Sequence, residues 1–537
     1  MKMTHYIRLF LRFKFTILIL IYLAAVLYFQ NRLYPVCILN AVSLLLYLHL
    51  FCRGRFRLFF LIPFSILLTF EAYYAFFFHS VVTLGILASI FETTVTEASS
   101  VFKTLIPGTI IIGSITFSLV FLSSKELNQL KLSRKWSAIL LILYVFIGIP
   151  LYLRREINKK FQFQVLFRES PIPISQYHIS NGFTLVYGTM ITVVAHQQEI
   201  KNVKEYVGGN RILPDGIILK NEMNVPEKIY FVIGESQWRE HLSVYGYSVK
   251  TTPFMDSISK ACPDQVFVYP NVISPACLTR DVFRLLLSFA TPQHSSPFYT
   301  QKNLVEMAND AGYQTLWITN QSSRGVFDTY ASMIAKSSEY FYYNDKDRDD
   351  LILIPVIKEK IQPDFKQFFL INLVGSHSSY KDRYDEIDQK HISGNDVISD
   401  YNRTIHHTDR FMKDLYELIK NDSSSLFIYI SDHGEDVKSE GHGFLGKGTA
   451  QFEIPFIVIN NSDVPVDSMI MKYKDSENNS MNTLNINYII SEMMGYSISE
   501  ETIQFVQEQS QYIFHVDGNY YRYSDIEKEN VSDSLIK

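Results

Sequence analysis

Five long apolar segments within the first 153 residues restrict the fold of this chain more than any other feature. They are Phe10–Phe29, Leu33–Phe51, Leu58–Phe78, Leu105–Ser123 and Ala138–Leu153. A helix needs about 20 mainly apolar residues to cross a bilayer. Basic clusters separate these segments, so we predict a five-helix transmembrane domain over residues 1–153 rather than five core helices. The first segment is interpreted as a retained anchor and not as a cleaved signal peptide, because further apolar segments follow it.

The basic residues between the apolar segments predict the orientation of the chain. They gather before the first segment, between the second and third, and between the fourth and fifth. The two internal clusters are Arg53, Arg55 and Arg57, and Lys125, Lys131, Arg134 and Lys135. Cytoplasmic loops carry the excess of Lys and Arg, so the N-terminus is expected in the cytoplasm. An odd number of spans then places the rest of the chain outside it.

Beyond the apolar part, the chain changes to the composition of an ordinary soluble protein. We expect an amphipathic linker on the membrane surface over residues 154–215 and a catalytic domain over residues 216–537. The net charge of -4 argues against a nucleic-acid partner. Cys262 and Cys277 are expected to be able to form one disulfide, and no Cys-x-x-Cys spacing suggests a structural zinc site.

Short apolar runs alternate with helical patterns in the soluble part. The expected strands are Ile229–Ile233, Gln314–Ile318, Phe368–Val374, Leu426–Ile430 and Ile454–Ile459. The expected helices include Asn303–Ala311 and Ser399–Lys420, and a hairpin is expected over Tyr512–Tyr523. This alternation predicts an α/β domain of three layers, α/β/α, with a mainly parallel sheet.

Acidic residues and histidines follow three of the expected strands. Glu235 follows the first, His377 the third, and Asp432 and His433 the fourth. The carboxyl ends of parallel strands share one edge of the sheet, where active sites form. Carboxylates and imidazoles bind zinc or manganese, so these residues predict a metal site. His442, between two glycines, is a further candidate ligand.

A metal of this kind would act with a nucleophile, for which Thr279 is the best candidate. It precedes an apolar helical run and is expected at the N-cap, where threonine is common for purely structural reasons. A helix N-terminus also favours a phosphate. Ser274 and Cys277 compete for the role, but the residues after Cys277 do not match the pattern of a sulfatase nucleophile.

Several ordered motifs resemble those of bacterial lipopolysaccharide phosphoethanolamine transferases, of the alkaline phosphatase and sulfatase superfamily. The first motif is Val-Ile-Gly-Glu-Ser-Gln-Trp-Arg-Glu-His-Leu-Ser-Val-Tyr-Gly-Tyr over 232–247, followed by Thr251-Thr252-Pro253. Val-Gly-Ser-His-Ser-Ser-Tyr over 374–380 and Ser-Asp-His-Gly-Glu over 431–435 resemble the later motifs. Five spans before the soluble domain also match, so the resemblance covers nearly the whole chain.

The resemblance implies an alkaline phosphatase-like fold and a role for each candidate residue. A zinc ion would be held by Glu235, Thr279, Asp432 and His433, with Thr279 as the nucleophile. His377 and His442 would contact the substrate phosphate or a second zinc and help to protonate the leaving group. Thr93 and Glu97, four residues apart, match a loop that helps to form the lipid-substrate pocket. From spacing alone these two would be a solvated turn beside the membrane.

The implied reaction transfers phosphoethanolamine from phosphatidylethanolamine to an envelope glycolipid, through a covalent phospho-threonine intermediate. The acceptor would be the lipopolysaccharide core, lipid A or another envelope glycan. The enzyme would be a multi-pass protein of the bacterial inner membrane with a periplasmic catalytic domain. Three alternatives remain: a glycerol-phosphate transferase similar to lipoteichoic acid synthase, a membrane-tethered phosphodiesterase or sulfatase, and a non-catalytic membrane sensor.

Overall fold

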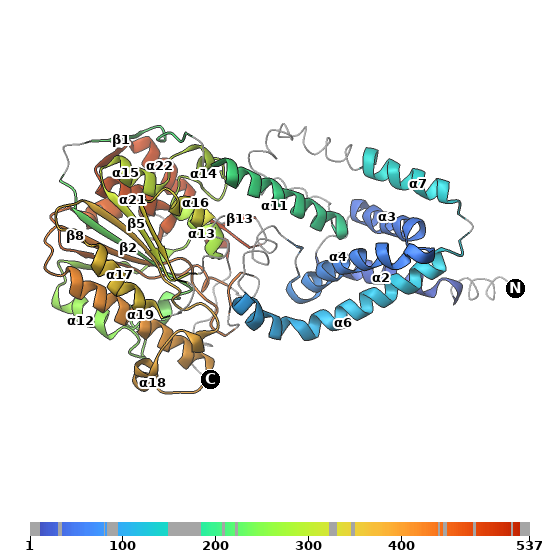
Figure 1. The fold of residues 1–537 in the computed structure, drawn as a ribbon, viewed down its shortest axis with the longest axis horizontal. Coiled ribbons are helices and arrows are strands. Elements are labelled where there is room, and N and C mark those ends of the chain that lie inside the picture. The colour runs from blue at the N-terminus through green and yellow to red at the C-terminus, as the bar shows by residue number, and fades with distance from the viewer. Residues whose placement is uncertain are drawn as a thin grey trace. The chain divides into compact units, whose positions relative to one another are not determined.

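The computed structural model of this chain (Figure 1) contains two compact units, Met1–Lys201 and Asn202–Lys537. The structure describes residues 11–30, 35–79, 81–82, 95–130, 132–148, 184–206, 210–220, 224–321, 330–344, 349–438, 441–443, 448–475, 480–516 and 519–526. We call the two parts the N-terminal unit and the C-terminal unit, and describe each by itself.

The N-terminal unit consists of helices in its described part. They are α2 (Lys14–Phe29), α3 (Pro35–Phe51), α4 (Arg57–Phe78), α6 (Val95–Leu127), α7 (Arg134–Leu143) and α11 (Val186–Tyr206). The first five overlap the five predicted apolar segments. Within the described residues, Gly54–Phe78 and Ile106–Leu127 are long and apolar enough to cross a membrane, whereas Lys14–Phe29 and Cys37–Phe51 are apolar but shorter. The number of five spans therefore stays a prediction.

Buried polar contacts join helices of the N-terminal unit. Glu126 of α6 accepts hydrogen bonds from the backbone N–H groups of Phe15 (3.1 Å) and Thr16 (2.8 Å). These N–H groups lie in the first turn of α2, where a helix offers no carbonyl partner of its own. In the same way, Glu71 of α4 accepts hydrogen bonds from Gln30 and from Thr189 of α11. Both glutamates thus fasten one helix of the unit to another.

The C-terminal unit is built on a seven-stranded sheet. In spatial order its strands are β3 (Val266–Val268), β9 (Phe456–Asn460), β8 (Ser425–Ser431), β2 (Lys228–Gly234), β7 (Gln367–Asn372), β5 (Gln314–Thr319) and β6 (Tyr340–Tyr343). Strand β9 runs antiparallel to both of its neighbours, and the remaining pairs are parallel. The expected mainly parallel sheet is confirmed. Every residue of β2, β7 and β8 is buried, as in a sheet covered on both faces.

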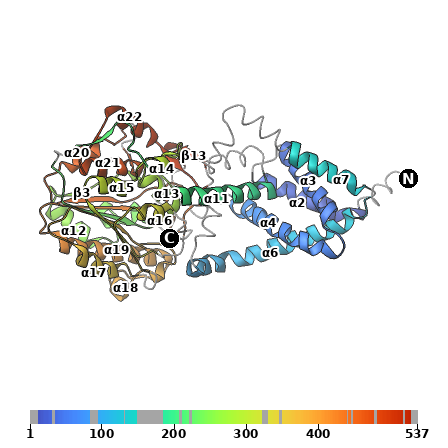
Figure 2. The ribbon, with the colours of Figure 1, turned by 45° about the horizontal axis from the view of Figure 1, so that its top comes forward.

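Helices cover both faces of this sheet (Figures 1 and 2). Helices α12 (Pro253–Ala261), α17 (Leu353–Lys360) and α19 (Val397–Ile419) lie on one face, and α15 (Leu304–Asp310), α20 (Val466–Met471), α21 (Ile486–Met493) and α22 (Glu500–Gln509) lie on the other. On the α19 face, alternate strand residues such as Tyr230 and Val232 pack in one core cluster with Met255, Ile357 and Phe411. The expected three layers are therefore present.

Shorter elements complete the C-terminal unit. The helices are α13 (Thr279–Leu286), α14 (Pro297–Thr300), α16 (Tyr330–Ala335) and α18 (Glu386–His391). The strands are β1 (Ile217–Leu219), β4 (Val272–Ile273), β10 (Met481–Asn482), β11 (Tyr496–Ile498), β12 (Tyr512–Phe514) and β13 (Tyr520–Arg522). Strands β12 and β13 pair antiparallel, which confirms the predicted hairpin.

Two sequence expectations need correction. Strand β7 ends at Asn372 rather than at Val374, because the N–H groups of Val374 and Gly375 bind the carboxylate of Asp350 and no longer a neighbouring strand. The disulfide considered for Cys262 and Cys277 does not form. Cys262 packs beside the large core cluster, whereas Cys277 belongs to a separate small cluster.

Candidate metal centre

The carboxyl ends of β2 and β8 bring together three of the predicted metal ligands. The two strands are adjacent and parallel, with Gly234 opposite Ser431. Glu235 directly follows β2, and Asp432 and His433 directly follow β8, at the same end of the sheet. One ligand atom from each of these three buried residues lies within 4.8 Å of the others. The sequence expectation that strand ends would gather these side chains agrees with this geometry.

Thr279, at the start of α13, joins this group. Its hydroxyl donates a hydrogen bond to Glu235 Oε1 over 3.1 Å and lies 3.2 Å from His433 Nε2. His433 Nε2 is in turn 3.3 Å from Asp432 Oδ2 and 3.4 Å from Glu235 Oε1. Three oxygen atoms thus surround one imidazole nitrogen.

The donor set fits a divalent metal ion. His433 Nδ1 lies 2.8 Å from the carbonyl oxygen of Gly434 and must donate to it, which leaves the lone pair of neutral Nε2 directed at the other three residues. Asp432 Oδ1 accepts the N–H groups of Ser236 and His433. Asp432 Oδ2 is buried and makes no hydrogen bond to any described residue. A cation would satisfy this oxygen, and two carboxylates, an imidazole and a hydroxyl are ligands that zinc accepts.

The electrostatics of the protein alone show a site that needs positive charge. Burial and the nearby charge of Glu235 raise the pKa of Asp432 above its ordinary value. Burial disfavours a charged His433, but the carboxylates of Asp432 and Glu235 outweigh it and raise its pKa to about 10. Burial also opposes the charge of Glu235, yet the imidazole of His433 keeps the pKa of that carboxyl well below its ordinary value. Without a metal, a proton on His433 supplies the charge.

The structure corrects the expected capping role of Thr279. Leu278 occupies the N-cap position of α13, where its side chain makes no capping hydrogen bond, and Thr279 is the first helical residue. The hydroxyl of Thr279 points to Glu235 and His433 instead. The competing nucleophiles are less suitable, because the hydroxyl of buried Ser274 donates to backbone carbonyl groups and Cys277 is packed in an apolar cluster.

His442 lies next to the candidate metal ligands, with its ring centroid 4.0 Å from that of His433. Its Nδ1 is 2.9 Å from Glu435 Oε2, so these two atoms share one proton in a hydrogen bond. Tyr380 donates to the other oxygen of Glu435 over 2.8 Å. Burial raises the pKa of Glu435 to about 8. Glu435 therefore fixes the ring of His442.

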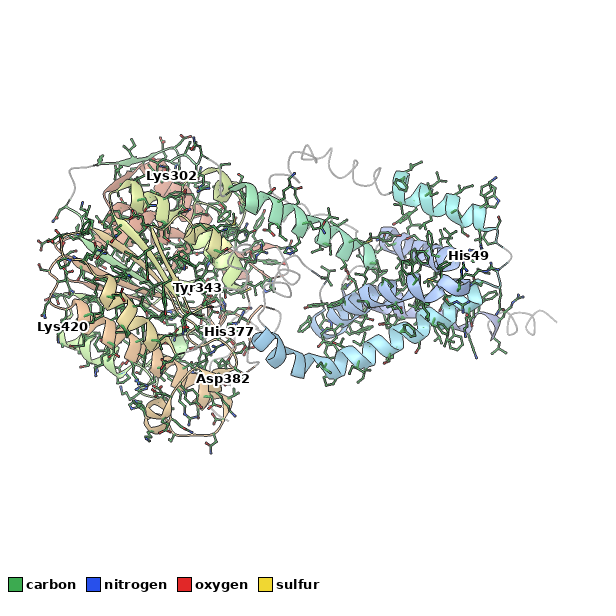
Figure 3. The ribbon with its side chains drawn as sticks, viewed as in Figure 1. His49, Lys302, Tyr343, His377, Asp382 and Lys420 are labelled. Atoms are coloured by element: carbon green, nitrogen blue, oxygen red, sulfur yellow. The ribbon has the colours of Figure 1, made fainter. Side chains whose placement is uncertain are left out.

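His377 follows β7 and lies at the same end of the sheet as Tyr343, the last residue of β6 (Figure 3). Its ring centroid is 6.3 Å from that of His442. Its Nδ1 lies 2.7 Å from the carbonyl oxygen of Ser378, so this nitrogen donates and Nε2 is available to a substrate. The two histidines proposed to contact the substrate therefore lie near each other, and His442 lies next to the candidate metal ligands.

Three residues to which the sequence analysis assigns no role support this site. Gln321, two residues beyond the end of β5, donates to Glu235 Oε2 over 2.9 Å. Glu435 holds His442, and Asp350 binds the loop that leads to His377. The strand-end rule could have found Gln321, because β5 belongs to the same parallel sheet. No sequence signal marks Asp350, because its contacts with Val374 and Gly375 form only when the chain folds.

The structure does not describe the side chains of Thr93 and Glu97, the two residues matched to a lipid-substrate loop. Thr93 lies outside the described residues. Glu97 falls in the first turns of α6, whose helical backbone is described but whose side chain at this position is not. Their role stays a prediction.

A second cluster of acidic residues and histidines lies between α18 and α19. Asp388 binds His406, His407 and Arg410 over 2.6 Å, 2.7 Å and 2.9 Å. Asp385, Asp388 and His407 approach one another as metal ligands do. The guanidinium of Arg410 already binds both aspartates, however, so this cluster is an ion-pair network rather than a cation site.

A family model described as "Sulfatase" matches residues 228–496, which include all the residues of this centre and half of the chain. The chain belongs to the sulfatase family. Among curated relatives, the phosphoethanolamine transferase EptC of Escherichia coli K12 is 28% identical over 290 residues, which cover 49% of this chain and 50% of EptC. The phosphoethanolamine transferase CptA of Salmonella typhimurium is 27% identical over 261 residues, which cover 44% of this chain and 45% of CptA.

This chain thus spans about half the length of the curated relatives it matches. These relatives confirm the resemblance that the motifs indicate.

Solved structures extend the likeness in fold. An integral membrane protein, the lipooligosaccharide phosphoethanolamine transferase A of Neisseria meningitidis, matches with a TM-score of 0.57 and 16% identity, over 91% of this chain and 95% of that one. The periplasmic domain of EptC of Escherichia coli, solved in complex with zinc, matches with a TM-score of 0.51 and 24% identity, over 59% of this chain and 97% of that domain. The C-terminal unit therefore has the fold of these transferase domains.

Proposed function

We propose that this chain is a zinc-dependent phosphoethanolamine transferase that takes its donor group from phosphatidylethanolamine. One observation carries the proposal: the hydroxyl of Thr279 is within hydrogen-bond distance of both Glu235 and His433, in the group that also contains Asp432. The names of the curated relatives, and the zinc in the solved EptC domain, support the reaction and the metal.

Glu235, Asp432, His433 and the oxygen of Thr279 would hold the zinc ion. Bound there, zinc supplies Lewis-acid chemistry that favours the ionised hydroxyl and offsets charge on phosphoryl oxygens. Manganese would accept a similar set of ligands. Gln321 orients Glu235 through its second carboxylate oxygen, and Gly434 orients His433 through its carbonyl group.

The reaction is a double displacement at phosphorus. In the first step the oxygen of Thr279 forms a bond to phosphorus and the bond from phosphorus to the diacylglycerol oxygen breaks. The proton that the hydroxyl of Thr279 gives up balances the one that the leaving oxygen takes up, and His442 or His377 is placed to accept a proton and pass it to that oxygen. In the second step an acceptor oxygen displaces Thr279, which regains its proton. The acceptor proposed is a hydroxyl or phosphate of an envelope glycolipid such as lipopolysaccharide.

The proposed donor is a lipid. This would explain why the catalytic domain is joined to the apolar helices of the N-terminal unit. We propose a bacterial inner-membrane protein with five spans, a surface linker and a periplasmic catalytic domain. Thr93 and Glu97 are proposed to contribute to the lipid-binding part of the site. Reporter fusions after residues 53, 131 and 216 test the topology, since only the last is expected outside the cytoplasm.

The function is tested with purified full-length protein in vesicles that contain phosphatidylethanolamine and lipopolysaccharide. Mass spectrometry is expected to find diacylglycerol and lipopolysaccharide that carries added phosphoethanolamine. Thr279→Ala should lower transfer on the order of 10³-fold or more, because the nucleophile is gone, while Thr279→Ser keeps a hydroxyl and should retain part of it. Release of free phosphoethanolamine without a modified acceptor would instead identify a hydrolase. Transfer only from phosphatidylglycerol would identify a glycerol-phosphate transferase.

A further inference from the structure

A buried carboxylate beneath the candidate site holds the loop that carries His377. Asp350 is 3% exposed and lies at the start of a short 3-10 helix, Asp350–Ile352. Its Oδ1 accepts the N–H of Val374 over 3.0 Å, and its Oδ2 accepts the N–H of Gly375 over 2.9 Å. The side chain of Asn320, just beyond β5, donates to Oδ1 over 3.1 Å. One carboxylate thus gathers the ends of two strands.

The same loop is pressed against the backbone of Glu235 on its other side. Gly375 has φ +51°, and a Cβ placed on it would lie 2.8 Å from the nitrogen of Glu235. The N–H of Ser376 donates to the carbonyl oxygen of Glu235 over 2.9 Å. The loop from Val374 to His377 is therefore held on one side by the backbone of Glu235 and on the other side by the carboxylate of Asp350.

A buried charge of this kind is costly unless it is fully hydrogen-bonded. Burial raises the pKa of the Asp350 carboxyl despite the N–H groups of Val374 and Gly375. An apolar residue would avoid this cost but would leave both N–H groups without an acceptor. The arrangement indicates that the exact path of this loop matters for more than packing.

We propose that Asp350 is a positioning residue for His377 in phosphoryl transfer. The inference rests on the proposed function, in which His377 contacts the phosphoryl group or the leaving oxygen. Asp350 itself does not touch the substrate. Its carboxylate holds the backbone of Val374 and Gly375, and this backbone determines where the side chain of His377 begins. A displacement of about 1 Å at a reacting group costs on the order of 100-fold in rate.

The test compares Asp350→Asn with a matched variant, Asp409→Asn. Asp409 is a buried aspartate of α19 that also accepts two backbone N–H groups, from Phe254 (2.7 Å) and Met255 (3.1 Å), but it holds α12 instead of the site loop. Both variants lose the same kind of interaction. Only Asp350→Asn should lower kcat, by about 10- to 100-fold, with bound zinc unchanged. If Asp350→Asn does not fold, Asp350→Glu replaces it in the test. This variant keeps the charge but shifts the carboxylate oxygens, so it should also lower kcat.

A double variant decides whether the effect passes through His377. The losses from Asp350→Asn and His377→Ala should not multiply, because the first acts by misplacing the group that the second removes. Multiplied losses, or a wild-type kcat in Asp350→Asn or in His377→Ala, would overturn the inference.

Hydrogen exchange separates failure of this inference from failure of the proposed function. Exchange measured by mass spectrometry over residues 367–380 should be faster in Asp350→Asn and unchanged in Asp409→Asn, and this readout needs no activity. If the wild-type protein transfers no phosphoethanolamine, the proposed function is wrong and the role of Asp350 in transfer is wrong with it. If the wild type transfers the group but exchange over this loop is unaltered in Asp350→Asn, only the positioning role is wrong.

Discussion

His407 is expected to make the stability of the C-terminal unit depend on pH in the alkaline range. Its Nδ1 lies 2.7 Å from Asp388 and its Nε2 lies 2.9 Å from Asp349. Carboxylates only accept, so both ring nitrogens must carry a proton and the ring is positively charged. Burial opposes this charge, but the hydrogen bonds to Asp349 and Asp388 outweigh it and raise the pKa of His407 to about 9 from the ordinary value of 6.5.

The size of the effect follows from this pKa shift. A rise from 6.5 to about 9 corresponds to about 3 kcal/mol of folding free energy. The folded state holds the proton more tightly than the unfolded state. The contribution is therefore complete below pH 6.5 and is lost as the pH rises through about 9.

The assay is the free energy of unfolding of the full-length protein in detergent, from denaturant titrations between pH 6 and pH 10. His407→Gln should be less stable than wild type at pH 6 and should nearly match it at pH 10. Asp349→Asn should reduce the pH dependence, because one of the two carboxylates is removed. His294→Gln, at an exposed histidine outside the network, should retain the wild-type dependence. If the free energy of unfolding of His407→Gln changed with pH as steeply as that of wild type, the proposed role of His407 would be wrong.

Three further predictions follow from the site and the N-terminal unit. Glu435→Ala should keep zinc bound but lower kcat by about 10- to 100-fold, because the ring of His442 loses its side-chain partner; zinc analysis and steady-state kinetics check this. Chelation of the metal should abolish transfer and lower the midpoint of thermal unfolding, with both restored by added zinc, since a metal that binds only the folded site stabilises the folded state. Glu126→Ala should destabilise the N-terminal unit by about 1 kcal/mol through loss of the cap on α2, measured by unfolding in mixed detergent micelles.

Much of the centre could be predicted from strand ends. Apolar runs that end in Glu235 and in Asp432-His433 give the ligands directly, because parallel strands present their carboxyl ends together. The position of Thr279 before an apolar helix also points to a role. Its contact with Glu235 and His433 depends on how α13 packs, which local sequence does not determine.

Other features needed the fold. The sequence of β9 does not reveal its direction, because a buried antiparallel strand has the same apolar composition as a parallel one. β3 and β6 are three and four residues long, too short for a clear pattern. Asp350 and the partners of His407 are far in sequence from the residues they bind, so their hydrogen bonds cannot be read from spacing. The absence of a bond between Cys262 and Cys277 likewise follows from their places in different clusters.

In the proposed reaction, Thr279 carries the phosphoethanolamine group between donor and acceptor. The most direct measurement is mass spectrometry of peptides from purified full-length protein incubated with phosphatidylethanolamine and no acceptor. A phosphoethanolamine adduct on Thr279, removed when acceptor is added and absent from Thr279→Ala, is the predicted result. No adduct in the wild type, together with full transfer activity in Thr279→Ala, would contradict the account.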